Sequence, residues 1–491
     1  MTRSGMIRFR ILSLAVLVGA AALLFTRSRV ANGRTSADYE PRPASAISSP
    51  VAFLNVTVLP MDRQGGISDQ TVIVRDGRIV SVGPSARASV PGDALRIDGR
   101  GKFLMPGLAE MHAHVQGPQA ANADELNRDI MFLYVANGIT TIRAMLGAPN
   151  QLVLRDRIAR GEVLGPTMFV AAPSLNGQSA PTPEVAARLV RAHKTAGYDL
   201  LKIHPGLTRP AYDAIVKTAR ETGITWGGHV SAQIGVGHIL DTKQSTIDHL
   251  DGYIEAAASD EMKRLMTTPG AAITQRQIWN SVTDDRIREL ARRTRQAGTW
   301  NVPTMFLWES FSAAGSPEEW AKREEMKYAP RQWVANWVNQ KNQRIQAEVR
   351  EGVAPADALL HLALRRKMLK ALADEGALLL MGTDSPQMFN VPGFALHREL
   401  GVAIAAGLTP FQVLESGSRN VGRYVAQDLK KDGNFGTVTR GSRADLVLLN
   451  SNPLTSVNNL TDRAGVMVRG RWVSRGEIEK GLEALAAKYR L

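Results

Sequence analysis

Short apolar runs alternate with amphipathic stretches through the middle of the chain. The stretches 183–197 (PEVAARLVRAHKTAG) and 209–223 (RPAYDAIVKTARETG) have the apolar spacing of helices. Eight other runs have the length and composition of strands: LAEMHAH (108–114), GITTIRAM (138–145), TMFVAAP (167–173), DLLKIHPG (199–206), TWGGHVS (225–231), STIDHLDG (245–252), TWNVPTMF (299–306) and ALLLMGTDSP (377–386). Eight strand–helix repeats predict an α/β fold, a (β/α)8 TIM barrel over residues 105–432. An open doubly wound sheet is the alternative, but no glycine-rich dinucleotide loop supports it.

The two ends of the chain carry a different pattern, one of alternating apolar and polar residues. TVIVRDGRIVSVG (71–83) predicts a hairpin that turns at Asp76 and Gly77. RADLVLLN (443–450) and GVMVRGRWVS (465–474) predict further strands, the second a hairpin that turns near Gly470. We therefore expect a small β-sandwich domain built from both ends, residues 50–104 and 433–480.

The first 35 residues combine a basic start with an apolar run over residues 11–25. A run of fifteen residues suits a signal peptide and is short for a spanning helix, which needs about 20. We expect residues 1–35 to be a signal peptide or an N-terminal membrane anchor, followed by a flexible linker over 36–49. A buried helix of the fold is the weaker alternative. The protein is expected to be exported, periplasmic or secreted, with membrane contact only through an uncleaved anchor.

The charge balance and the composition exclude several classes of function. The formal net charge is +14, but six of the positive residues are arginines of the first 35 positions. Because no basic cluster with interleaved aromatic residues occurs elsewhere, we expect no nucleic-acid partner. The absence of cysteine excludes disulfides and thiolate metal ligands.

Two long insertions follow the sixth and seventh predicted strands, at 253–283 and 308–372. The second carries four tryptophans: Trp308, Trp320, Trp333 and Trp337. Packing onto the barrel or onto another subunit is the favoured role, because buried aromatic residues usually serve cores and interfaces. A lid over the substrate is the alternative. A homo-oligomer stays open.

Polar residues fall at the ends of several predicted strands. His112 and His114 are two residues apart, so they share one face of a strand, although such a pair alone is often part of an ordinary core. Because the carboxyl ends of parallel barrel strands meet on one face, four further residues join them in one cavity. They are Lys202, His229, His249 and Asp384.

Lys202 is the unusual member of this set, because a protonated ammonium would be repelled by bound cations and is costly to bury. Reaction of the neutral amine with carbon dioxide gives a carbamate, an anionic ligand that can bridge two metals. An ordinary lysine paired with a carboxylate is the alternative.

The order His-x-His, Lys, His, His, Asp over eight strands, with a split β domain, resembles the amidohydrolase superfamily. The resemblance covers about residues 50–480 and is strongest to the imidazolonepropionase-like and prolidase-like branch. It depends on four motifs: LMPGLAEMHAH, GITTIRA, HRELGVAIAAGLTP and RADLVLLN.

The resemblance implies two divalent metal ions. His112, His114 and Asp384 would hold one, His229 and His249 the other, and N-carboxylated Lys202 would bridge both. A water between the ions would attack a carbonyl, and Asp384 would be the catalytic residue that takes the proton and passes it to the leaving group. Zinc is the natural ion for such ligands, and manganese or cobalt would also fit.

Two further residues are candidates for substrate binding. His204 shares the face of Lys202, so it is expected either to contact substrate or to have a structural role. Arg143 ends the second predicted strand, where it could pair with a substrate carboxylate. A structural ion pair is the favoured interpretation for Arg143.

The resemblance and the residues together predict an exported binuclear metal-dependent enzyme that hydrolyses amide or peptide bonds of small molecules. A dipeptidase, a prolidase-like enzyme and an N-acyl amino acid hydrolase all fit, including one acting on the amide of ochratoxin. The alternative enzyme opens cyclic amides or imides or is a deaminase; Lys202 argues against it, because relatives with that chemistry typically lack the bridging lysine. An inactive binding or scaffold protein is the alternative of another class, although all six ligand residues are present.

Overall fold

The computed structural model describes residues 49–312, 315–350 and 353–490. The expected leader, 1–35, and all but the last residue of the expected linker, 36–49, lie outside the described residues. Among the helices of the described residues, none is both long and apolar enough to cross a bilayer.

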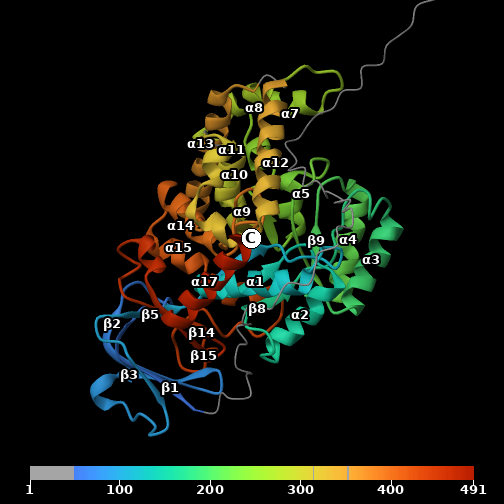
Figure 1. Ribbon diagram of the computed structural model, residues 1–491. Helices are drawn as coiled ribbons and strands as arrows, with labels where there is room; N and C mark the ends of the chain where they lie inside the picture. Colours follow the sequence, from blue (N-terminus) through green and yellow to red (C-terminus); the bar gives the residue numbers. More distant parts are fainter. Residues whose placement is uncertain (1–48, 313–314, 351–352, 491) are drawn as a thin grey trace, which may run out of the picture.

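Strands from the two ends of the chain form one eight-stranded mixed sheet, in which blue and red strands lie side by side in Figure 1. The N-terminal part supplies β1 (Val51–Val58), β2 (Ile67–Arg75), β3 (Arg78–Pro84), β4 (Leu95–Asp98) and β5 (Phe103–Pro106). The C-terminal part supplies β13 (Leu446–Leu449), β14 (Arg463–Val468) and β15 (Arg471–Ser474). The order is β15-β14-β13-β5-β1-β2-β3, with β4 paired to β1, and the ends join where β13 runs antiparallel to β5. The arrangement of these strands as a sandwich stays a prediction.

Two hairpins of this sheet turn at the positions that the sequence predicts. Asp76 and Gly77 connect β2 to β3 with φ of 50° and 72°, and Arg469 and Gly470 connect β14 to β15 with φ of 48° and 83°. Positive φ at both central residues gives a turn whose twist matches that of the flanking strands. The two tips also touch, because a Cβ atom on Gly470 would lie 2.7 Å from the Cα atom of Gly77.

Seven strands of the middle region form two parallel sheets. The first contains β6 (Leu108–Ala113), β7 (Ile139–Ala144) and β8 (Thr167–Val170). The second contains β9 (Leu200–Ile203), β10 (Thr225–Gly228), β11 (Thr246–Asp248) and β12 (Trp300–Val302). Isolated parallel bridges continue the order between the sheets: Ala171 with Leu200, Leu175 with Ile203, Asn301 with Leu379, and Ala113 with Ser385. Isolated bridges, and not continuous ladders, therefore join the two sheets, and the strands of the described residues do not close into the predicted eight-stranded barrel.

The prediction of an eighth strand over residues 377–386 is wrong, because this segment forms no strand. Its backbone hydrogen bonds are divided among several neighbours: Leu380 N donates to Asn301 O, whereas Thr383 N donates to the Glu110 carboxylate. At Asp384 the backbone turns through a φ of 66°, which ends extended pairing. The segment still occupies the place between β12 and β6.

Helices connect and cover the strands. Between strands lie α1 (Ala123–Ala136), α2 (Pro149–Ala159), α3 (Pro183–Thr195), α4 (Arg209–Thr222), α5 (Gly235–Thr242) and α9 (Asp284–Ala297). The later ones are α14 (Phe394–Ala405), α15 (Pro410–Ser416), α16 (Arg419–Gln427) and α17 (Arg475–Arg490). Thr182 and Thr208 cap α3 and α4 by accepting a hydrogen bond from the first turn, which also contains a proline.

The two predicted insertions are helical and lie together at the top of Figure 1. The first contains α6 (Tyr253–Ala256), α7 (Asp260–Thr267) and α8 (Gln275–Asn280), and the second α10 (Met305–Ser312), α11 (Pro317–Ala321), α12 (Arg331–Arg350) and α13 (Pro355–Asp374). Trp308, Trp320 and Trp337 are buried. Their burial favours the packing role over a mobile lid.

Candidate metal centre

Five of the six residues expected to bind metal lie at the carboxyl ends of parallel strands, and the sixth, Asp384, lies in the segment beside β6. His112 is in β6 and His114 follows it directly, and Lys202 is in β9. His229 and His249 each come immediately after their strands, β10 and β11. Asp384 lies in the segment that bridges to β6. Because all these strands run parallel, their ends bring the side chains to one face.

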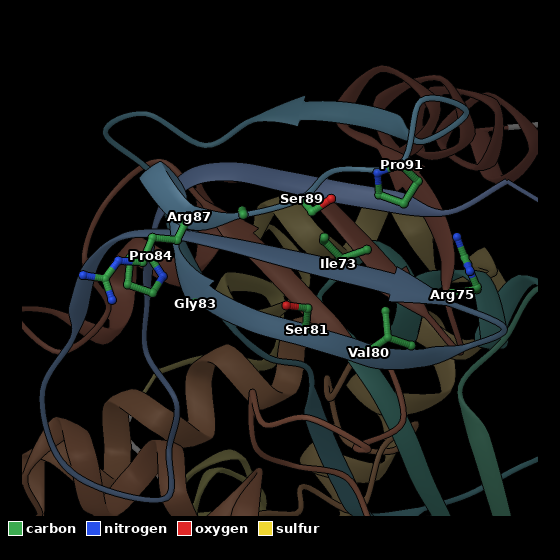
Figure 2. Close-up of a pocket in the computed structure, with 10 residues that line it drawn as sticks. Ile73, Arg75, Val80, Ser81, Gly83, Pro84, Arg87, Ser89 and Pro91 are labelled. Carbon is green, nitrogen blue, oxygen red and sulfur yellow. The ribbon is translucent and has the colours of Figure 1, made fainter.

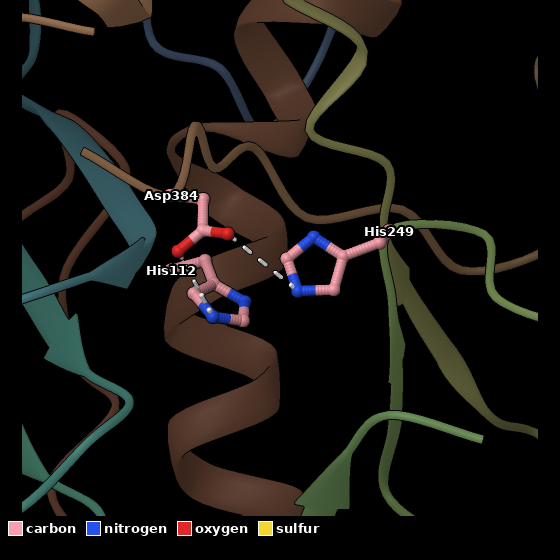
Figure 3. A group of neighbouring side chains, drawn as sticks. All are labelled: His112, His249 and Asp384. Carbon is pink, nitrogen blue, oxygen red and sulfur yellow. Dashed lines mark ion pairs between the residues drawn. The ribbon is translucent and has the colours of Figure 1, made fainter. Parts of the chain in front are cut away.

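Asp384 is at the centre of the cluster, and in Figure 3 dashed lines join its carboxylate to His112 and to His249. Its Oδ1 lies 2.5 Å from His114 Nε2 and 3.5 Å from His112 Nε2. Its Oδ2 lies 3.8 Å from His249 Nε2. One ligand atom each from His112, His249 and Asp384 lies within 4.8 Å of the others, a spacing that one metal ion can span.

Lys202 and His229 complete the cluster. Lys202 Nζ lies 3.1 Å from His112 Nε2, and its side chain is buried. Burial lowers the pKa of Lys202 to about 8, so part of the amine is neutral near neutral pH. The ring of His229 lies with its centroid 4.6 Å from that of His249 and 6.4 Å from that of His112. The structure thus brings all six predicted residues together.

Three histidines turn their Nδ1 atoms to protein partners. His112 Nδ1 lies 3.0 Å from Asp248 Oδ2, His229 Nδ1 2.7 Å from Asp251 Oδ2, and His249 Nδ1 2.8 Å from Thr304 Oγ1. At His229 and His249 the contact is a hydrogen bond, which fixes the tautomer and the orientation of the ring and leaves Nε2 available. The contact of His112 with Asp248 is close enough for an ion pair but lacks hydrogen-bond geometry. The sequence did not predict Asp248, Asp251 and Thr304 as partners of the histidines. The first two flank His249 in STIDHLDG, which is the only signal that could have found them.

The residues present fit a bound cation. Burial holds the pKa of His112, His229 and His249 well below the usual value, with the charge of Lys202 or of neighbouring histidines as a further cause. The rings are therefore neutral and keep a lone pair for a ligand bond. His249 Nε2 and Asp384 Oδ1 are buried, and neither makes a hydrogen bond of good geometry within the described residues, although Oδ1 lies 2.5 Å from His114 Nε2. A cation among these nitrogen and oxygen atoms would satisfy both.

Glu110 is a further buried carboxylate that the sequence analysis missed. It accepts hydrogen bonds from His112 N at 2.9 Å, from Thr383 N at 2.8 Å and from Thr383 Oγ1 at 2.5 Å. Burial raises its pKa to about 8, although these hydrogen bonds oppose the rise. Glu110 thereby links β6 to the segment that carries Asp384, which forms no strand of its own.

The two residues expected to contact substrate have different surroundings. Arg143 is fully buried, and its guanidinium donates to Met111 O at 2.7 Å, Tyr424 Oη at 3.1 Å and Asp248 Oδ1 at 3.1 Å. This favours the structural ion pair over a substrate contact. The ring centroid of His204 lies 4.6 Å from that of His229, and burial lowers its pKa to about 3. His204 is therefore a neutral neighbour of the cluster, where substrate contact stays a prediction.

A surface hollow of about 440 Å³ lies elsewhere, on the eight-stranded sheet formed by the two ends of the chain (Figure 2). Residues of β2 and β3, among them Ile73, Val80 and Ser81, line it together with Arg87 and Pro91. None of the metal-centre residues contributes to it. The hollow is therefore separate from the candidate metal centre.

Comparisons with known proteins agree with this geometry. A model of the Amidohydrolase family matches residues 103–473. An imidazolonepropionase of Stenotrophomonas maltophilia (strain R551-3) is 32% identical over 112 residues, 21% of this chain and 28% of the relative. An adenine deaminase of Ruegeria pomeroyi is 24% identical over 227 residues, 43% of this chain and 37% of the relative. The matches thus span 28% and 37% of the two relatives' lengths.

A similar solved structure is that of a candidate prolidase from Bifidobacterium longum. It is 23% identical, with a TM-score of 0.63, and the match covers 89% of this chain and 99% of that one. At this level of identity, the likeness concerns the fold.

Proposed function

The chain belongs to the amidohydrolase family, as its motifs predict, and from that premise we propose that it is a two-metal hydrolase of amide or peptide bonds. The observation that carries the proposal is the convergence of His112, His114, His229, His249, Lys202 and Asp384 at one face of the parallel strands. We take the strands, their joining bridges and the segment around Asp384 as a (β/α)8 barrel.

The donor set divides into two ion sites. As the resemblance implies, His112, His114 and Asp384 would hold one ion, and His229 and His249 would hold the other. N-carboxylated Lys202 would bridge them, and the neutral fraction of its amine permits the carboxylation. When bound, two divalent ions such as zinc supply an acidified water as nucleophile and a Lewis acid for the substrate carbonyl.

Asp384 holds and moves the proton in this proposal. Its two carboxylate oxygens face different histidines, Oδ1 toward His114 and Oδ2 toward His249. At that place the Asp384 carboxylate would accept a proton from the attacking water and deliver it to the leaving nitrogen, which would depart as an amine. Asp248, Asp251 and Thr304 keep the imidazole rings oriented meanwhile.

The substrate class is a small molecule with an acyl–nitrogen bond, such as a dipeptide or an N-acyl amino acid. The similarity to a prolidase fold supports it. Ring opening or deamination is the second candidate, which the similarity to an imidazolonepropionase and an adenine deaminase favours. Lys202 at 3.1 Å from His112 favours the two-metal hydrolase.

The test begins with the metal content of the purified full-length protein, for which we expect about two ions per chain. Removal of the ions with a chelator should abolish turnover, and zinc, manganese or cobalt should restore it. His229→Ala should lose one ion, whereas His193→Ala, in α3 and outside the cluster, should keep both.

A substrate panel then separates the candidates. We expect turnover of dipeptides, X-Pro dipeptides or N-acyl amino acids, with the ochratoxin amide as a further member. Turnover of cyclic imides or aminated rings alone would transfer the assignment to the second candidate. Metal-loaded protein that turns over no member of the panel would indicate a binding protein.

A further inference from the structure

The backbone of His249 is held from both sides. Its N–H donates to Val302 O of β12 at 2.7 Å. Its carbonyl oxygen accepts two hydrogen bonds, from Trp308 Nε1 at 3.0 Å and from Arg365 Nη1 at 2.6 Å. Both donors come from the second insertion, Trp308 from α10 and Arg365 from α13.

These three hydrogen bonds hold a part of the backbone that is strained. His249 has a φ of 63° and Leu250 one of 51°, a conformation that is unfavourable for residues other than glycine. Such conformations persist only where the surroundings over-determine them, and they occur preferentially at functional sites. Without the two donors, the carbonyl of His249 would be a buried acceptor with no other hydrogen bond among the described residues, and an extended backbone would turn the imidazole away from Asp384.

Arg365 is itself fixed by a stack of aromatic rings. Its guanidinium lies 3.4 Å from the ring centroid of Trp308, and its Nε donates to His361 Nε2 at 3.1 Å. His361 in turn stacks on Trp279 of α8 at 4.7 Å between centroids, with 12° between the planes. A cation over an aromatic face that also donates to a carbonyl makes a strong, directional contact. Both insertions therefore contribute to holding one guanidinium against one carbonyl.

The charge on Arg365 is retained in this buried place. Burial lowers its pKa to about 10, and the nearby carboxylates of Asp251 and Glu255 oppose the decrease. At neutral pH the group is a cation and donates a charge-assisted hydrogen bond.

We propose that Arg365 and Trp308 are positioning residues that hold His249 in its left-handed conformation and so aim its Nε2 at the second metal ion. This inference rests on the proposed metal site and assigns the two insertions a role in metal affinity.

Three variants of the full-length protein test the proposal: Trp308→Phe, Arg365→Leu and Arg365→Lys. Their matched controls are Trp333→Phe, in the same insertion, and Arg366→Leu, whose side chain pairs with Glu309 instead of His249. Competition with a chromophoric chelator measures the dissociation constant of the weaker zinc ion, and thermal unfolding measures folding.

We expect Trp308→Phe to weaken the second zinc ion about 10-fold and Arg365→Leu about 100-fold, the range observed when partners of metal ligands are removed. Arg365→Lys should recover part of the loss, because an ammonium can still donate to the His249 carbonyl. With saturating zinc, kcat should return toward the wild-type value while KM changes little.

Three outcomes are distinguishable. Wild-type protein that binds no metal would overturn the proposed function itself. If the wild-type protein binds two ions and Trp308→Phe binds zinc with unchanged affinity, only the positioning role of Trp308 and Arg365 is overturned. Equal losses in the controls would overturn it as well, because general loosening of the insertion would then explain the effect. If Arg365→Leu fails to fold, Trp308→Phe and Arg365→Lys still decide.

Discussion

Replacing Arg143 with methionine should destabilise the protein without removing a substrate contact. Arg143 and Asp248 are both completely buried, 3.1 Å apart, and Asp248 also faces His112 Nδ1. Burial alone would raise the pKa of Asp248, but the charges of Arg143 and Lys202 outweigh it, and the pKa is lowered. Methionine preserves much of the apolar volume and leaves this carboxylate without its strongest partner.

The expected loss follows from the burial of the pair. Breaking a buried ion pair by removing one partner costs about 3–5 kcal/mol, because the remaining charge is uncompensated. Unfolding entropy of roughly 2 cal/mol/K per residue gives a chain of this size about 1 kcal/mol/K, so Tm should fall by about 3–5 °C. Adding Asp248→Asn should recover part of this loss, because the unpaired charge disappears.

The assay is thermal unfolding of the metal-loaded protein, with steady-state kinetics on the same samples. Arg128→Met is the control, because Arg128 pairs with Asp124 at the surface with more than half of each side chain exposed. Its loss should cost less than about 1 kcal/mol. An unchanged Tm in Arg143→Met together with a strongly raised KM would refute this reasoning and make Arg143 a substrate contact.

Three further results are expected. Lys202→Ala should abolish turnover and lose bound metal, and short carboxylic acids should restore part of the activity by replacing the carbamate; full activity without them would contradict the bridging role. Burial lowers the pKa of His397 from 6.5 to about 3, so between these values the unfolded chain binds a proton that the folded chain does not. Stability should therefore fall by up to about 1.4 kcal/mol per pH unit as the pH drops through this window, and His397→Gln should flatten the slope in acid unfolding measurements. Gly177→Ala should lower kcat/KM by about 10-fold or more with a smaller effect on Tm, because its Cβ would lie 2.3 Å from Gly206 O and displace the loop beside His204; wild-type kinetics would show that the loop gives way freely.

Much of the architecture could be predicted from local patterns. Alternation and turn residues located both hairpins, since positive φ at Asp76–Gly77 and at Gly470 is a local requirement. The apolar runs located seven of the eight barrel positions as strands. The prediction of a strand at 377–386 was wrong although the composition of this run is that of a strand. The Thr383 N–H, which would pair with a neighbouring strand, donates instead to the Glu110 carboxylate.

The convergence of the candidate ligand residues was predictable for a similar reason. Strand periodicity and the parallel order place residues at the same end of different strands, so His112 and Asp384 could be brought together without coordinates. The role of Arg143, in contrast, could not be predicted from its position in a strand. Position at a strand end made a substrate contact conceivable, but only the packing reveals that Asp248, Met111 and Tyr424 take its hydrogen bonds.

The sequence by itself determined the repeating strands, the sheet shared by both ends and the residue types of the metal centre. These features depend on spacing along the chain, which is local information. Only the tertiary structure decided which atom of each imidazole is free and which group holds the other nitrogen. It also decided that helices more than 50 residues beyond His249 hold the His249 carbonyl through Trp308 and Arg365. Such contacts join side chains that no periodicity relates, and they form only when distant elements pack at one distance and angle.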